Sequence, residues 1–275
     1  MTRQVYFVSD ATAITAETLA RSVLTQFRSV RFTPNRIPFV NTVDKAVRAA
    51  DDINKVFIET GVRPLVFATF VSQELREAFE SHCLGFCIDF FDAFIKKVEA
   101  ELGVASSQAT GVSHEIDDAL AYDRRMDAIN FTLMHDDGQL DEGLDQAEVI
   151  LVGVSRCGKT PTSLFLAMQY AIRAANYPLI PEDFERGELP AALRRVKDRI
   201  FGLSIAPERL AQVRNERRPD SRYASIENCR YEVEACERLM AREGIRWLNS
   251  TTRSIEEIAA TIIAQFGLSN ATRLD

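Results

Sequence analysis

Residues 151–180 read LVGVSRCGKTPTSLFLAMQYAIRAANYPLI, and the centre of this stretch has the spacing of a phosphate-binding loop. Glycines at positions 153 and 158 are followed by Lys159 and Thr160, which fits the pattern G-x-x-x-x-G-K-[ST]. The apolar run 149–152 precedes the pattern, and a helical repeat of apolar residues follows it over 159–175. This order of strand, loop and helix predicts a nucleotide-binding α/β domain.

The chemistry of such a loop comes mainly from its backbone. Its glycines let successive N–H groups turn towards a phosphate, and the start of the helix adds a partial positive charge. We expect Lys159 to reach the phosphoryl oxygens, Arg156 to supply a second cation, and the Thr160 hydroxyl to hold Mg²⁺. The predicted nucleotide-binding residues are Gly153, Val154, Ser155, Arg156, Cys157, Gly158, Lys159 and Thr160. The simpler alternative is a glycine turn that only starts a helix.

A carboxylate that could bind the metal or activate the acceptor is not obvious, because no apolar strand in the second half ends in Asp. Asp183, just past a predicted strand, is one candidate catalytic residue, and Asp10 at the end of VYFVSD is another. The segment His135–Gly138 (HDDG) is a third. The structural alternatives are an acid in a turn for Asp183, a helix cap for Asp10 and a helix end for the HDDG segment.

A second group of cations follows the loop in the segment 207–240. Arg217, Arg218 and Arg222 flank Pro219-Asp220, which we predict to be a loop between two helices. An arginine-bearing loop of this kind can close over a phosphate and neutralise charge during transfer, so these residues are predicted lid contacts. A solvated helix face, with Glu208 and Glu216 as partners, remains the alternative.

The rest of the chain alternates between strand and helix patterns, which predicts an α/β fold with mostly parallel sheets. We expect an N-terminal α/β domain over 1–102, a linker and bridging helix over 103–144, and a kinase-like domain with the phosphate loop over 145–275. In the first domain, the patterns predict strands at 5–8, 36–42 and 63–70, a helix at 45–61, and a helix at 71–102 that breaks at Gly85.

Composition narrows the possible functions. With 275 residues, 46% of them hydrophobic, the chain can build two modest cores. A formal charge of −7 disfavours a nucleic-acid or anionic-membrane binder. No apolar run is long enough to span a membrane and no secretion signal is evident, so we expect a cytoplasmic protein. Five scattered cysteines predict no disulfide framework.

Several segments resemble one bacterial family, in matching order along nearly the whole chain. They are FVSDATAITAETL, TGVRPLVF, MHDDG, the stretch from the phosphate loop to PEDF, FGLSIAPERL, RNERRPDSRYAS and LNSTTRSIEEIA. On these segments the chain resembles the phosphoenolpyruvate synthase regulatory proteins, of the pyruvate, phosphate/water dikinase regulatory family. A sister branch, which acts on pyruvate, phosphate dikinase, tends to have Thr-Ser where this chain has Cys157-Gly158, so the resemblance favours the synthase as target.

The resemblance implies a bifunctional regulator. It implies an ADP-dependent serine/threonine kinase that inactivates phosphoenolpyruvate synthase, and a phosphorylase that reverses this with inorganic phosphate and releases diphosphate. It also implies Mg²⁺, the synthase as protein partner, and a homodimer. From the residues alone, a small-metabolite kinase or nucleotidase and a nucleotide-sensing adaptor without transfer activity stay open.

Overall fold

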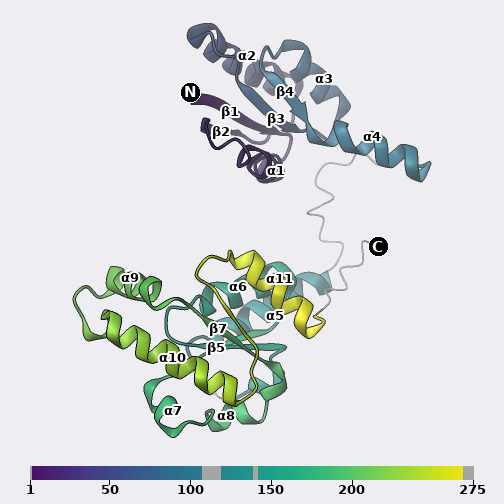
Figure 1. Ribbon diagram of the computed structural model, residues 1–275. Helices are drawn as coiled ribbons and strands as arrows, with labels where there is room; N and C mark the ends of the chain where they lie inside the picture. The colour runs from purple at the N-terminus through teal and green to yellow at the C-terminus, as the bar shows by residue number, and fades with distance from the viewer. Residues whose placement is uncertain (1, 107–118, 139–141, 269–275) are drawn as a thin grey trace. The chain divides into compact units, whose positions relative to one another are not determined.

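The computed structural model describes residues 2–106, 119–138 and 142–268. The chain divides into two compact units, residues 1–115 and 116–275. Each unit contains a four-stranded sheet in which all paired strands are parallel, with helices on both faces, so the predicted α/β fold class is confirmed (Figure 1). Among the described residues, no helix is both long and apolar enough to cross a membrane.

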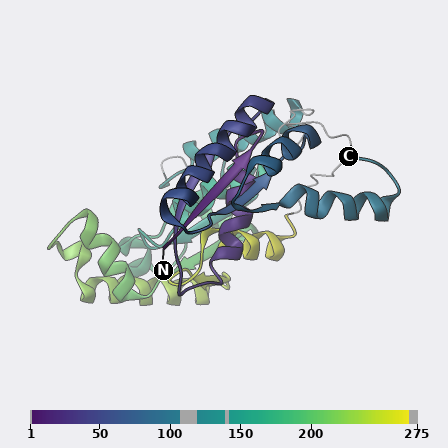
Figure 2. The ribbon, with the colours of Figure 1, turned by 90° about the horizontal axis from the view of Figure 1, so that it is seen from above.

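The first unit builds its two hydrophobic layers from the alternation of side chains along one central strand. Its elements are β1 (Thr2–Ser9), α1 (Ile14–Leu24), β2 (Arg31–Ile37), α2 (Val43–Thr60), β3 (Leu65–Thr69), α3 (Gln73–His82), β4 (Phe86–Asp89) and α4 (Phe90–Leu102). Val5 and Phe7 of β1 pack with residues of α1 and α4, whereas Tyr6 and Val8 pack with residues of α2 and α3. The sheet therefore lies between two helical layers (Figures 1 and 2).

The second unit repeats this plan around β5, whose five residues are all buried. Its elements are α5 (Ala119–Met134), η2 (Leu144–Gln146), β5 (Val149–Gly153), α6 (Lys159–Tyr170), β6 (Ala174–Pro178), α7 (Pro181–Arg186), α8 (Ala191–Arg194), η3 (Lys197–Arg199), β7 (Ile200–Ser204), α9 (Pro207–Arg217), η4 (Arg222–Ala224), α10 (Ile226–Arg242), β8 (Trp247–Asn249) and α11 (Ile255–Phe266). Helices α5, α6 and α11 cover one face of the sheet, and α7, α8 and α10 lie on the other (Figure 1).

The strand order is the same in both units, β2-β1-β3-β4 in the first and β6-β5-β7-β8 in the second. In each sheet, the strand that comes first in the chain is followed by its neighbour on one side, and the chain then crosses to the neighbour on the other side. Ligands of open α/β sheets bind at such a reversal point, outside the carboxyl ends of the strands. In the second unit, this point is where the predicted phosphate loop leaves β5.

Three element predictions were wrong in position. The strand predicted at 36–42 lies at Arg31–Ile37. It is a half-exposed edge strand, so its sequence has no apolar pattern and an edge position tolerates Pro34. The helix predicted over 71–102 is interrupted at Gly85 as expected, but strand β4 follows the break before the helix resumes as α4. A Cβ on Gly85 would meet the Val66 side chain of β3 at 2.7 Å. The helix predicted to run to 175 ends at Tyr170, with Ala171 in a left-handed conformation.

The helix predicted between the two halves is α5, and it packs on α6 and β6 of the second unit. Helix α5 therefore lies beside α6, the helix that follows the predicted phosphate loop. Most of the predicted linker, residues 107–118, lies outside the described residues.

Candidate phosphate-binding site

The predicted phosphate loop of the second unit runs from the end of β5 to the start of α6. Arg156 and Gly158 have positive φ values of 76° and 100°, which lets the backbone curl between the two elements. Gly153 lies against β7, since a Cβ at this position would meet the Leu203 carbonyl oxygen at 2.2 Å. A Cβ on Gly158 would meet nothing within 4 Å. The loop is thus packed on its β7 side and open at its junction with α6.

Lys159 folds back over this loop. Its side chain is 4% exposed, and the ammonium donates a hydrogen bond of 2.9 Å to the Val154 carbonyl oxygen. This bond holds the positive charge inside the curl of the backbone. Arg156, by contrast, is exposed.

The loop is supported from behind by the carboxyl ends of β7 and β8. The Ser250 hydroxyl lies 2.8 Å from the Cys157 carbonyl oxygen and 3.0 Å from that of Ser204. Burial raises the pKa of the Cys157 thiol, and it raises the pKa of Cys236 to about 12. Both thiols are therefore protonated at neutral pH and serve as packing groups rather than nucleophiles.

A buried arginine ties the loop to the segment after β7. Arg214 of α9 is fully buried, and its Nη2 donates to the Ser155 carbonyl oxygen at 3.2 Å and to the Glu232 carboxylate at 2.6 Å. Its Nη1 donates to the Tyr223 carbonyl oxygen at 3.1 Å, and the guanidinium lies 4.1 Å from the centre of the Tyr223 ring. The Tyr223 hydroxyl is in turn 3.0 Å from the Ser155 hydroxyl. Arg214 thus couples the loop to helices α9 and α10.

The sequence did not single out Arg214 as a site residue, because a buried arginine cannot be told from its exposed neighbours by spacing. The predicted lid residues Arg217 and Arg218, at the end of α9, and Arg222, in η4, are all exposed. They flank a turn at Asp220, which has a positive φ of 52°. Phosphate contacts by these three residues stay a prediction.

The histidine segment places a carboxylate at the phosphate loop. Asp136 Oδ1 accepts a hydrogen bond of 3.0 Å from the Thr160 hydroxyl and one of 2.5 Å from the side-chain amide of Asn176 in β6. The same amide nitrogen lies 2.8 Å from Thr160 Oγ1 and 3.4 Å from Asp137 Oδ1. A short backbone pairing builds the arrangement, since Asn176 N donates to the His135 carbonyl and Gly138 N donates to the Asn176 carbonyl.

The other two acidic candidates have structural partners. Asp183 is buried at the start of α7, where it accepts from the Ile180 N–H at 3.1 Å and from Arg186 at 2.6 Å. Asp10 lies in the first unit, where it accepts from the N–H groups of Val71 and Ser72 just before α3. These contacts are those of a helix-start acid and a cap. A catalytic role for Asp183 stays a prediction.

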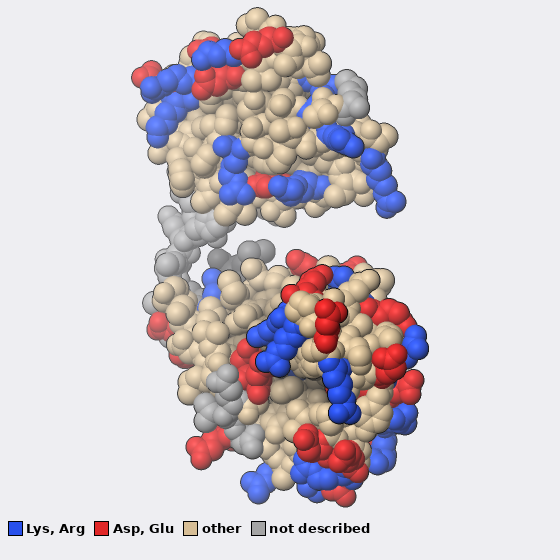
Figure 3. Space-filling model, turned by 90° about the vertical axis from the view of Figure 1, so that its left-hand side faces the viewer, with Lys and Arg blue, Asp and Glu red and all other residues tan. Residues whose placement is uncertain are grey.

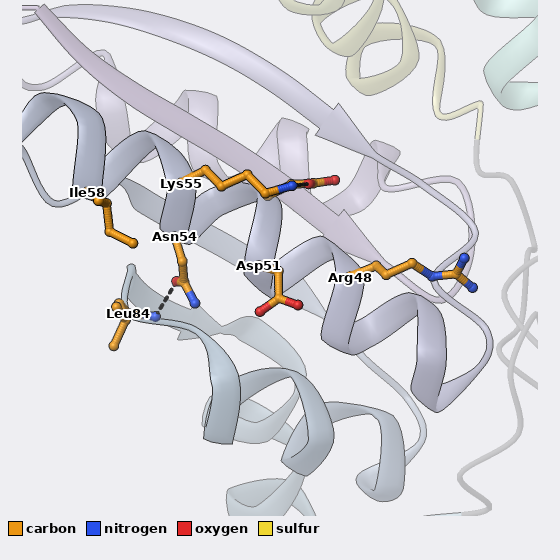
Figure 4. Close-up of a pocket in the computed structure, with 7 residues that line it drawn as sticks. Arg48, Asp51, Asn54, Lys55, Ile58 and Leu84 are labelled. Atoms are coloured by element: carbon orange, nitrogen blue, oxygen red, sulfur yellow. Dashed lines mark hydrogen bonds and ion pairs between the residues drawn. The ribbon is translucent and has the colours of Figure 1, made fainter.

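A depression of the first unit lies on α2. Arg48, Asp51, Asn54, Lys55, Ile58 and Leu84 line it (Figure 4). Within this lining, Lys55 pairs with Asp52 at 2.7 Å and the Leu84 N–H donates to the Asn54 side chain, so these polar groups bond one another rather than a common point (Figure 4). On the face in Figure 3, acidic and basic residues are interspersed without an unbroken basic surface.

The fold defines an α/β protein with a glycine-containing loop between β5 and α6, and comparison with known proteins gives its family. The model of the kinase/pyrophosphorylase family matches residues 5–263, so the chain belongs to this family. It is 57% identical over 266 residues to a protein of Bordetella avium (strain 197N) named "Putative phosphoenolpyruvate synthase regulatory protein", covering 97% of each chain. A protein of the same name from Janthinobacterium sp. (strain Marseille) is 57% identical, over 97% of this chain and 94% of the relative. Another from Azoarcus sp. (strain BH72) is 55% identical, over 95% of this chain and 94% of the relative. The resemblance found in the sequence is thereby confirmed.

Proposed function

We propose that this chain is a bifunctional regulator of phosphoenolpyruvate synthase, an ADP-dependent serine/threonine kinase and a phosphate-dependent phosphorylase. The observation that carries the proposal is the phosphate loop at 153–160, with Lys159 held inside it, in a chain similar over its full length to relatives bearing the regulator's name. A phosphate-transfer enzyme of this family needs one anion site with fixed positive charge, and this loop supplies it.

In the kinase direction, the threonine hydroxyl of the synthase attacks the β-phosphorus of ADP. The bond from this phosphorus to the bridging oxygen breaks, AMP leaves, and the hydroxyl proton is released. Phosphoryl transfer depends mostly on positioning and charge stabilisation. The loop N–H groups and the Lys159 ammonium surround the β-phosphoryl oxygens, and Arg156 at the tip of the loop adds a second positive charge.

In the phosphorylase direction, an oxygen of inorganic phosphate attacks the phosphorus of phosphothreonine. The threonine oxygen leaves and takes a proton, and diphosphate is the other product. We infer that the same loop holds the attacking phosphate, because it provides the anion site that both directions require. This sharing fails if Lys159→Ala or Gly158→Ala abolishes one activity and leaves the other intact.

Mg²⁺ is part of the proposal, with the Thr160 hydroxyl as a ligand. In the described part of the chain, three or more His, Cys, Asp or Glu side chains nowhere gather in a metal-binding group. This fits Mg²⁺, which commonly uses one or two protein ligands together with substrate phosphates and water. When bound, the ion neutralises charge on the phosphate oxygens.

The test is transfer of label from β-labelled ADP to purified phosphoenolpyruvate synthase, prepared with its catalytic histidine phosphorylated. We expect label on a synthase threonine that requires ADP, is not supported by ATP, and disappears with Lys159→Ala. ADP binding without transfer to the synthase would overturn the proposal and leave a sensor or a kinase with another acceptor. A homodimer is also proposed, and sedimentation of the full chain at micromolar concentration tests it.

A further inference from the structure

We propose that Asp136 is the carboxylate ligand of a magnesium site beside the predicted phosphate loop. Thr160 is its second protein ligand, and Asn176 positions both and can turn its own amide oxygen to the ion. This inference rests on the proposed nucleotide site and assigns its missing acidic group. The carboxylate comes from the turn before β5, not from a strand end.

The strand end beside the loop carries no carboxylate. β7 pairs with β5 and ends at Ser204, whose hydroxyl donates a hydrogen bond to Glu237 of α10. This bond holds the Glu237 carboxylate towards β7. Glu237 is therefore the competing candidate for the metal ligand. Asp136 is the acidic side chain that bonds directly to the loop threonine, at 3.0 Å.

The three polar side chains meet at one point. Asp136 Oδ1 and Thr160 Oγ1 are 3.0 Å apart, and the Asn176 amide nitrogen lies within 2.8 Å of each. Two oxygens of this kind at the mouth of a phosphate loop suit a hard cation that also binds phosphate. Asp137 lies next to them, with its Oδ1 3.4 Å from the same amide nitrogen, and adds negative charge outside the direct contacts.

Asn176 supplies an independent sign of a ligand. The residue is 1% exposed, and its side-chain Oδ1 is buried without a hydrogen-bond partner. Leaving such an acceptor unpaired costs about 1–3 kcal/mol. Rotation of the amide by a half turn would bring Oδ1 to the point where Asp136 and Thr160 meet. In that orientation the Thr160 hydroxyl proton can satisfy only one of the contacts between the three oxygens, so a cation bound at this point would stabilise the rotated amide.

The turn that presents Asp136 is fixed on both sides. The His135 ring nitrogens lie 2.8 Å from the carbonyl oxygens of Phe131 and Glu142, and its ring stacks on that of Phe131 at 4.0 Å. The backbone bonds between this turn and Asn176 lock it to β6. Asp136 therefore keeps its place beside Thr160, as a metal ligand requires.

The experiment measures Mn²⁺ binding to the full chain by electron paramagnetic resonance, with and without ADP, and ADP binding by calorimetry in EDTA. For the ADP complex, Asp136→Asn should weaken Mn²⁺ binding by at least about tenfold. ADP affinity in EDTA should stay the same or rise, since a negative charge near the phosphates is lost. Asn176→Asp, which adds a carboxylate at the same point, should strengthen Mn²⁺ binding.

Two further variants make the outcome decisive. Asp198→Asn removes a surface carboxylate at the amino end of β7 and should bind Mn²⁺ as the unaltered chain does. Glu237→Gln tests the rival carboxylate. Unchanged Mn²⁺ affinity in folded Asp136→Asn, or a loss found only in Glu237→Gln, would overturn the inference. Failure of the unaltered chain to bind ADP would instead overturn the proposed function.

Discussion

Gly153 and Gly158 define the same sequence motif but have different surroundings. Gly153 is in contact with the backbone of β7, whereas Gly158 faces open space with a φ of 100°. The first glycine therefore serves packing of the sheet, and the second leaves room where a phosphate is expected.

This difference predicts opposite defects in two alanine variants. Gly158→Ala should fold, with a cost of about 1–3 kcal/mol for the left-handed backbone, and should bind ADP weakly because its methyl group enters the open space. Gly153→Ala should fail to fold or melt far lower, since β7 must shift. Thermal melts and ADP calorimetry on both variants make the comparison, and normal ADP affinity in Gly158→Ala would contradict it.

The five cysteines should differ in reactivity. A hydrogen bond from Cys87 lowers the pKa of the Cys83 thiol, and the same bond together with burial raises the pKa of Cys87. Because only the thiolate reacts, iodoacetamide should label partly exposed Cys83 first, and the pH at which its labelling rate levels off should be lower than for an unperturbed thiol. Peptide mass spectrometry over a pH series provides the measurement. Labelling of Cys157 or Cys236 ahead of Cys83 in the folded chain would refute this order.

At the scale of helices and strands, the buried pair between α9 and α10 holds the phosphate loop. Glu232→Gln leaves the Arg214 guanidinium buried without its counter-charge, which should cost about 3–5 kcal/mol of folding free energy. ADP binding should weaken too, because Arg214 also donates to Ser155. Glu208→Gln, which breaks an exposed pair with Arg230, is the matched control and should leave the melting temperature nearly unchanged. Equal melting temperatures for the two variants would show that the Arg214–Glu232 pair does not stabilise the fold.

What the sequence could predict depended on how local each feature is. The loop, its strand and the start of α6 are set by neighbouring residues, so their spacing identified them. The contact between Asp136 and Thr160 joins positions 24 apart and needs Asn176, a further 16 along the chain, so no periodic pattern revealed it. Strand β4 has only four residues, too few to separate from a helix by periodicity.

At the scale of the whole molecule, each unit has its own hydrophobic core. The large core includes residues of β5, β6 and β7, and two smaller clusters enclose the sheet of the first unit. Units with separate cores can fold alone. We expect residues 116–275 expressed alone to melt cooperatively and to bind ADP within about threefold of the full chain, as every contact described for the loop lies within this unit. Loss of ADP binding in a folded fragment would mean that the first unit contributes to the site.

The hydrogen bond from Ser250 to Cys157 also bears on biosynthesis. Ser250 follows β8 and lies 93 positions after Cys157, so the support behind the loop leaves the ribosome well after the loop itself. The first unit can complete its sheet while the second is still being translated, since domains fold as units during synthesis. A nascent chain that ends before β8 should therefore carry the whole loop sequence and still lack a formed nucleotide site. The predicted nucleotide site would then become competent only after β8 has been translated.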